Sequence, residues 1–102
     1  MTPYGISEKI WTMLLNTCFN FKSVERIILY GSRARSDYHM GSDIDIAIDA
    51  PHMSTQEFSQ LWNALDDLPL IFKLDVVHLQ TLQNPKLLQA IYKEGIPIVH
   101  PS

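Results

Sequence analysis

Two aspartates separated by a single residue, Asp43 and Asp45, open an apolar stretch that runs to Ile48. In an extended strand, side chains at positions i and i+2 project from the same face, so the two carboxylates are expected to lie together. Carboxylates side by side repel each other at neutral pH unless a cation sits between them. A hard divalent cation is the group that this pair favours. Taken alone, the same pattern also fits a solvated strand face.

A Gly-Ser pair, Gly31 and Ser32, comes after the apolar residues 27–30, and ten residues separate Ser32 from Asp43. Glycine at the end of a strand lets the backbone approach a ligand closely, and a serine that starts a helical turn offers N–H and hydroxyl groups to an anion. The pair alone is common in ordinary turns. Together, the two motifs predict a phosphate that docks at Gly-Ser while the aspartates hold its metal ion.

Asp75 is the candidate for a third carboxylate. It lies between Leu74 and Val76 in an apolar stretch, where a charged group is costly unless it is paired or binds a metal. Transfer at phosphorus commonly uses two metal ions about 3.5–4 Å apart, and such a pair needs three carboxylates. Lys73 projects from the same strand face, so the alternative is a Lys–Asp pair at a sheet edge.

The Gly-Ser, ten-residue, Asp-x-Asp pattern with apolar flanks resembles the signature of the polymerase-β-type nucleotidyltransferase superfamily. Because the chain has only 102 residues, it is most similar to the minimal nucleotidyltransferases (MNT) of prokaryotic HEPN/MNT toxin–antitoxin pairs. The resemblance is specific at the motif, and elsewhere it covers only the order of elements. It implies two Mg²⁺ ions and ATP as the nucleotide substrate.

The resemblance also implies the roles of individual residues. The expected catalytic and metal-binding residues are Asp43, Asp45 and Asp75, and the expected nucleotide-binding residues are Gly31, Ser32, Arg33 and Arg35. Asp75 would bind the metal that activates the nucleophile and would take its proton. Arg35 would reach the triphosphate, whereas a solvent-facing helix charge is the alternative for both arginines. Many relatives carry glycine where this chain has Ser36, so the turn at that point is expected to differ slightly.

The fold class expected from the chain is α/β (α+β): a small mixed sheet with helices packed against it, in the order αβαβαβα. Helical spacing and capping residues predict a helix from Ser7 to about Asn20, a short helix from Gly31-Ser32, a helix from Ser54 that ends before Pro69, and a helix from Asn84-Pro85 to Gly95. Apolar and β-branched stretches predict strands over Val24–Tyr30, Asp43–Ile48 and Leu70–Leu79, with an edge strand over Ile96–His100.

Composition restricts the function further. A length of 102 residues predicts a single domain, and the resemblance implies that residues 1–102 form one minimal nucleotidyltransferase domain. The net charge of −3 offers no basic field for nucleic acid, so template-dependent polymerisation and direct nucleic-acid binding are not expected. The lone Cys18 is expected in the core. No apolar run or leader pattern predicts a membrane segment, so a cytoplasmic location is expected.

No segment of the chain is expected to form a pocket for an acceptor, so a partner would have to supply one. The leading hypothesis is an antitoxin that transfers AMP from ATP to a hydroxyl, expected to be that of a tyrosine, on a helical HEPN toxin. One alternative is a binding module that neutralises its partner by occupancy alone. Another is the catalytic subunit of a small-molecule nucleotidyltransferase similar to the aminoglycoside-modifying enzymes.

Overall fold

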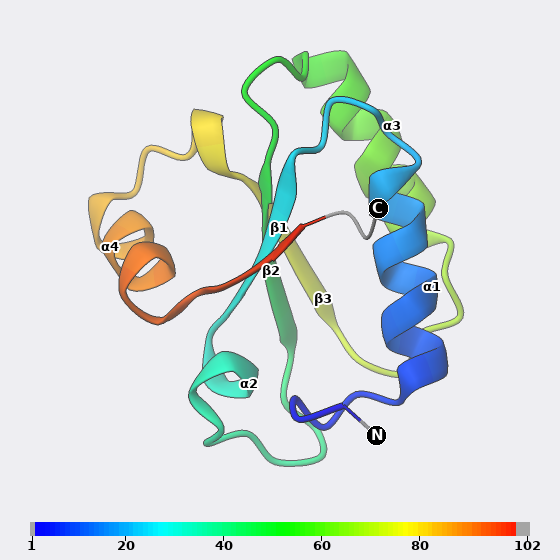
Figure 1. Cartoon of the computed structure of the whole chain (residues 1–102), viewed down its shortest axis with the longest axis vertical. Coiled ribbons are helices and arrows are strands. Elements are labelled where there is room, and N and C mark those ends of the chain that lie inside the picture. Colours follow the sequence, from blue (N-terminus) through cyan, green and yellow to red (C-terminus); the bar gives the residue numbers. More distant parts are fainter. Residues whose placement is uncertain (1, 100–102) are drawn as a thin grey trace.

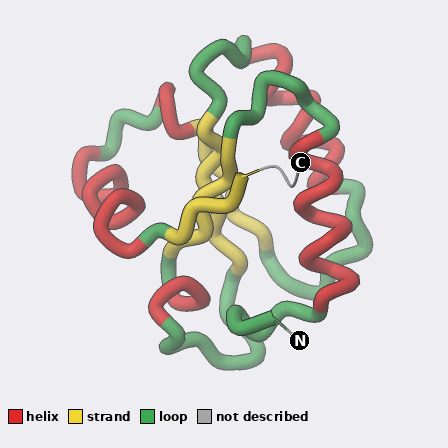
Figure 2. Tube along the Cα trace, viewed as in Figure 1, coloured by secondary structure: helices red, strands yellow, loops and turns green. Residues whose placement is uncertain are grey.

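The computed structural model describes residues 2–99, and a four-stranded sheet lies at its centre (Figures 1 and 2). The strands lie in the order β3-β2-β1-β4. β1 is antiparallel to β2 and to β4, whereas β2 and β3 are parallel. Their bounds are β1 Arg26–Tyr30, β2 Ile44–Asp49, β3 Leu74–His78 and β4 Ile96–Val99. The mixed sheet confirms the expected fold class.

The helices cover both faces of this sheet. Their bounds are α1 Glu8–Phe19, α2 Ser32–Arg35, α3 Thr55–Asp66 and α4 Pro85–Glu94, with a short 3₁₀ turn, η1, over Leu79–Thr81. Figure 1 shows α1 and α3 together on one side of the sheet and α4 on the other. None of the helices within residues 2–99 is long and apolar enough to cross a membrane.

Alternation along the strands sorts the apolar side chains between the two faces. Ile27, Leu29 and Ile46 are fully buried in the larger core, which α1 and α3 close with Leu14 and Leu61. The intervening strand residues Ile28, Tyr30 and Ala47 form a smaller core with Leu79 of η1 and Ile91 of α4. Asp45 belongs by register to this second face, since it pairs with Tyr30 across β1 and β2.

The expected N-caps are confirmed at three helices. The hydroxyl of Ser7 accepts a hydrogen bond from the Ile10 N–H, and that of Ser54 accepts one from the Glu57 N–H. The side chain of Asn84 caps α4, with proline at its first position. Cys18 is fully buried, as expected, and burial raises the pKa of its thiol to about 12.

The strand boundaries differ from the sequence-based prediction. β3 begins at Leu74 rather than at residue 70, because the chain before it forms a loop in which Ile71 is 91% exposed. β1 begins at Arg26 rather than at residue 24. β4 is an edge strand, as expected. The observed order of elements therefore has one strand after the last helix, which the order αβαβαβα does not include. His100, the last residue of the expected edge strand, lies outside the described residues.

Ser36 adopts a backbone conformation that glycine takes more readily than other residues. Its φ of 68° lies in the left-handed region, and it is the only non-glycine residue among residues 2–99 with a positive φ. The residue ends α2, and its N–H donates to the carbonyl of Ser32. A side chain in this region costs conformational energy that glycine does not incur.

Replacement of Ser36 by glycine should therefore stabilise the protein. We expect Ser36→Gly to raise the free energy of unfolding by about 0.5–1 kcal/mol, because relief of the left-handed strain outweighs the extra entropy of glycine in the unfolded chain. Urea unfolding at constant pH measures the change. Ser42→Gly, in the same loop, is the matched control and should not stabilise. Equal or lower stability of Ser36→Gly would contradict this assignment of strain.

Candidate functional site

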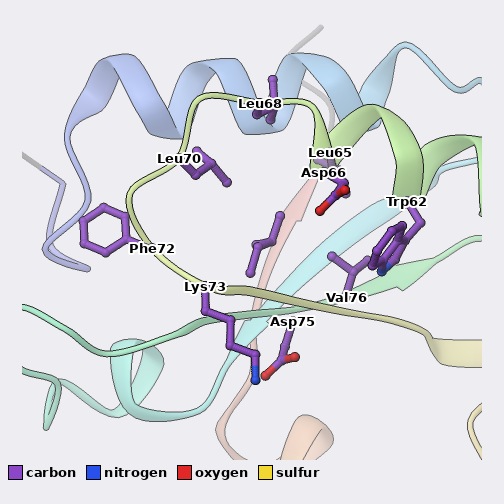
Figure 3. A pocket seen from close by; sticks show the side chains of 10 residues that line it. Trp62, Leu65, Asp66, Leu68, Leu70, Phe72, Lys73, Asp75 and Val76 are labelled. Atoms are coloured by element: carbon purple, nitrogen blue, oxygen red, sulfur yellow. The ribbon is translucent and has the colours of Figure 1, made fainter.

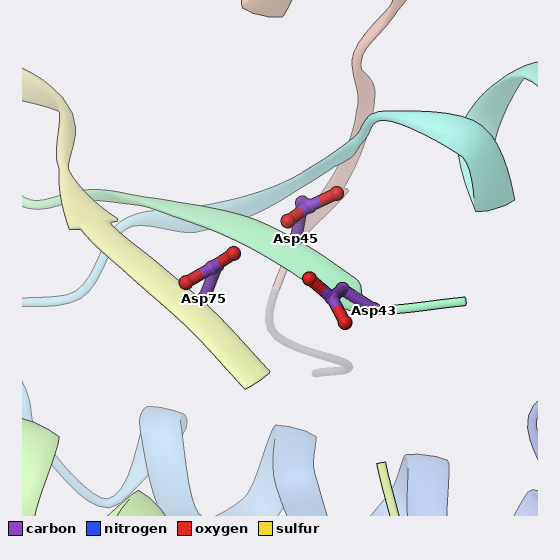
Figure 4. A group of neighbouring side chains, drawn as sticks. All are labelled: Asp43, Asp45 and Asp75. Atoms are coloured by element: carbon purple, nitrogen blue, oxygen red, sulfur yellow. The ribbon is translucent and has the colours of Figure 1, made fainter. Parts of the chain in front are cut away.

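The three expected carboxylates meet at one end of β2 and β3. The parallel register places Asp45 directly beside Asp75, and Asp43 lies one residue before β2 begins. One carboxylate oxygen from each residue lies within 4.8 Å of the other two (Figure 4). Their predicted proximity is confirmed, whereas their catalytic role stays a prediction. Oxygens converging from three carboxylates form a donor set that suits a hard divalent cation such as Mg²⁺.

The electrostatics of the cluster show that this convergence is unfavourable without a cation. All three aspartates are half-buried. Burial raises the pKa of Asp45 to about 6, and the negative charges of Asp75 and Asp43 and a hydrogen bond to Asp75 contribute to the same rise. Protonation or a bound cation relieves the repulsion, so the site favours a positive charge among these oxygens. This observation supports the fit of the residues to a metal.

Lys73 does not form the ion pair that was the alternative for Asp75. Figure 3 shows the side chains of Lys73 and Asp75 on the same side of β3, as expected from their spacing. However, no ion pair joins the two within the described chain. The carboxylate of Asp75 therefore remains associated with the other two aspartates rather than with this lysine.

Gly31 lies against the carboxylate of Asp45. Its φ is 77°, and a Cβ atom at this position would collide with an oxygen of the Asp45 side chain. Both the backbone conformation and the close approach require glycine. Ser32 occupies the first position of α2. The Gly-Ser pair is therefore adjacent to the carboxylate cluster, as the spacing of the motifs predicts.

Glu94, at the end of α4, was missed by the sequence analysis and contacts the Gly-Ser motif. Its Oε1 accepts a hydrogen bond from the Gly31 N–H at 3.2 Å and another from Nη1 of Arg35 at 3.0 Å. Arg35 also pairs with Asp37 at 3.0 Å. A carboxylate therefore occupies the position between the Gly31 N–H and Arg35 at which a phosphate was expected. Nothing in the local sequence around Glu94 indicates this contact.

Arg33 differs from its expected surroundings. The residue is 1% exposed, so the solvent-facing alternative is wrong. The guanidinium donates to the carbonyls of Tyr4 at 2.8 Å and Ser42 at 2.9 Å, and it lies over the rings of Tyr38 and Phe72. These contacts use its donors within the protein, so the structure assigns Arg33 to holding the chain together around the motif. The expected nucleotide contact of Arg33 stays a prediction.

Tyr30 is a second neighbour of the carboxylates that the sequence analysis did not identify. It is the register partner of Asp45 and is 7% exposed. Burial raises the pKa of its hydroxyl to about 12, with further contributions from the charges of Asp45 and Asp75. It therefore remains a neutral phenol at physiological pH and adds no negative charge to the site.

The raised pKa of Asp45 predicts a pH dependence of stability in the absence of metal. Because the folded-state pKa of about 6 exceeds the ordinary value of 3.8, the proton stabilises the folded state below pH 4, and this stabilisation is lost as the pH rises through 6. Solvent screening reduces the effect to the order of 1 kcal/mol. Asp45→Asn should reduce the change in the free energy of unfolding between pH 4 and pH 6. Urea unfolding in the presence of EDTA measures this change.

The matched control is Asp67→Asn, at the exposed end of α3, which should retain the pH profile of the unmodified protein. Mg²⁺ should also diminish the loss of stability toward neutral pH. If Asp45→Asn kept the full pH dependence of stability between pH 4 and 6, that dependence would have to come from groups other than Asp45.

Comparison with known proteins identifies the family. Residues 13–102 match the family described as polymerase beta, nucleotidyltransferase. No curated protein matches the chain. A crystal structure of a putative nucleotidyltransferase from Sulfolobus solfataricus has the same fold, with a TM-score of 0.53 and 18% identity over 95% of this chain and 87% of that one.

Two further crystal structures come from toxin–antitoxin complexes. One contains AMP-PNP and has a TM-score of 0.67 with 24% identity, covering 84% of this chain and 69% of that one. The other is a mutant of the MntA-HpeT pair in which two aspartates are replaced by glutamate. Its TM-score is 0.64 with 25% identity, covering 90% of this chain and 71% of that one. The chain belongs to the polymerase beta nucleotidyltransferase family.

Proposed function

We propose that this protein is a Mg²⁺-dependent nucleotidyltransferase that transfers AMP from ATP to a tyrosine hydroxyl on a partner toxin of the HEPN class, and so acts as its antitoxin. The observation that carries the proposal is the convergence of Asp43, Asp45 and Asp75 beside Gly31. The family supports nucleotidyl transfer as the reaction. The relatives solved as toxin–antitoxin complexes support a protein partner.

The residues divide into a metal-binding group and a phosphate-binding group. Asp43 and Asp45 would hold two Mg²⁺ ions, and Asp75 would hold the one beside the acceptor. When bound, the metal neutralises phosphate charge and lowers the pKa of the attacking hydroxyl. The N–H groups of Gly31 and Ser32 would face the phosphates. Arg35, whose side chain is 45% exposed, would neutralise charge on them.

The transfer exchanges one bond at phosphorus for another. The acceptor oxygen forms a bond to the α-phosphorus of ATP, and the bond from that phosphorus to the pyrophosphate oxygen breaks. Asp75 takes the proton of the hydroxyl, and pyrophosphate leaves with the electron pair. A half-buried carboxylate on an edge strand suits this role, because an acceptor can approach it from outside the sheet.

The first test is transfer of label from α-³²P-ATP to the co-purified partner in the presence of Mg²⁺. We expect Asp43→Asn and Asp45→Asn to lower the rate by roughly a hundredfold or more, because each removes charge that the metals require. Asp67→Asn is the control and should keep full activity. If no label moves while the complex still inhibits the toxin, the protein is a binding module, and transfer is not its function.

A second test concerns Glu94, whose carboxylate competes with phosphate for the Gly31 N–H and Arg35. We expect Glu94→Gln to tighten binding of a non-hydrolysable ATP analogue about three- to tenfold, because a negative charge beside the triphosphate is removed. Calorimetry measures the affinity. Glu25→Gln, an exposed acid at the opposite end of β1, is the control. Weaker binding by Glu94→Gln would show that Glu94 positions Arg35 for the nucleotide.

A further inference from the structure

The outer edge of β3 is open. β3 pairs only with β2 among the strands that the structure describes. Val76 and Val77, in its middle, remain half-exposed, whereas their neighbours Ile46 and Ala47 in β2 are fully buried. The Ile44 N–H donates to the Lys73 carbonyl at 2.9 Å, so the ladder with β2 leaves the backbone groups of Leu74 and Val76 facing outward. Such an edge is a template for another strand.

A hollow of about 430 Å³ runs beside this edge, on the side of α3 (Figure 3). Apolar and charged residues share its wall, which includes Trp62, Leu65, Leu70, Leu74 and Val76 together with Asp66, Lys73 and Asp75. Trp62, at the rim, is 45% exposed. We call this hollow the β3 groove. It lies next to the strand that carries Asp75.

The two sides of β3 differ in chemistry. Figure 3 shows the side chains of Val76 and Trp62 on one side of β3, whereas those of Asp75 and Lys73, which also line the hollow, project to the other side. Side chains alternate between the two sides along any strand that pairs with β3. One side chain of an added strand would therefore face Asp75 while its two neighbours in sequence entered the groove. Directly opposed residues on adjacent strands have Cβ atoms about 4.5–5.5 Å apart, so the side chain of that residue would extend along the same face of the sheet as Asp75.

We propose that the acceptor segment of the partner protein binds as an added strand along the outer edge of β3, with its tyrosine beside Asp75 and the flanking residues in the β3 groove. This inference rests on the proposed function, because it takes Asp75 as the residue that the acceptor approaches. The groove and edge are continuous with the carboxylate cluster, so one extended segment satisfies all three features. The flanking residues would be apolar, to match the apolar residues of the groove wall, such as Leu74 and Val76.

Lys73 adds a charge preference to this segment. It lies two residues before Asp75 on the same side of β3, and no ion pair joins it to an acid within residues 2–99. The residue of the added strand that faces Lys73 lies two positions from the tyrosine and would be acidic. The other edge strand, β4, is less suitable because Pro97 has no N–H to donate.

The test uses the full chain and a short synthetic peptide with a central tyrosine, leucine on each side of it and glutamate two positions away on both sides. Fluorescence anisotropy measures binding without ATP or Mg²⁺. N-methylation of alternate peptide amides should weaken binding roughly tenfold in one register and little in the other, because only one set of N–H groups faces β3. Equal effects in both registers, or no binding by the unmethylated peptide, would overturn the proposal.

Charge exchange gives an independent check. Lys73→Glu should weaken binding of the glutamate peptide severalfold and favour a peptide with lysine in place of glutamate, whereas Lys22→Glu, in the exposed link before β1, should change neither. Absence of this exchange would overturn the assigned register. The binding assay also separates the two proposals. If the peptide binds in one register but no AMP is transferred to the partner, only the proposed function is contradicted. If AMP is transferred and neither Lys73→Glu nor Trp62→Ala changes the rate, only the docking mode is contradicted.

Discussion

The parallel pairing of β2 with β3 is the constraint on which the site depends. It sets Asp45 beside Asp75, and a shift of one residue would turn the carboxylate of Asp75 to the opposite face of the sheet. The register is held by the larger core, in which Ile44, Ile46 and Ile48 are fully buried. Burial of these apolar residues offsets the repulsion between the carboxylates on the other face. The stability of the sheet thus maintains a cluster that is unfavourable without a cation.

The part of the site around the Gly-Ser motif is assembled from segments that are distant in the chain. Gly31 and Arg35 bracket α2, and Glu94 reaches both of them from the end of α4. An acidic side chain at this point keeps the Gly31 N–H and the Arg35 guanidinium satisfied when no phosphate is bound. The same contact joins the end of α4 to the motif, so under the proposed function a bound phosphate that displaced Glu94 would also release this tie to α4.

Much of the fold could be predicted from local pattern. Alternation revealed the strands, the side chains of Ser7, Ser54 and Asn84 marked helix starts, and the spacing of the two motifs indicated that they would meet. The remainder depends on tertiary contacts that local pattern does not encode. Arg33 contacts Tyr4 across 29 positions, and Gly31 contacts Glu94 across 63. The start of the third strand was placed too early because the apolar residues before it form a loop, which their composition does not distinguish from a strand.

The burial of Arg33 ties the start of the chain to the motif. Its guanidinium joins the carbonyl of Tyr4 to that of Ser42, which directly precedes Asp43. Through Arg33, Tyr4 therefore helps to hold the loop that precedes Asp43 in place. Removal of the residues around Tyr4 would leave the buried guanidinium of Arg33 with one acceptor fewer and would loosen that loop. A fusion placed next to Tyr4 would therefore disturb the loop before Asp43, although Tyr4 and Asp43 are far apart in the sequence.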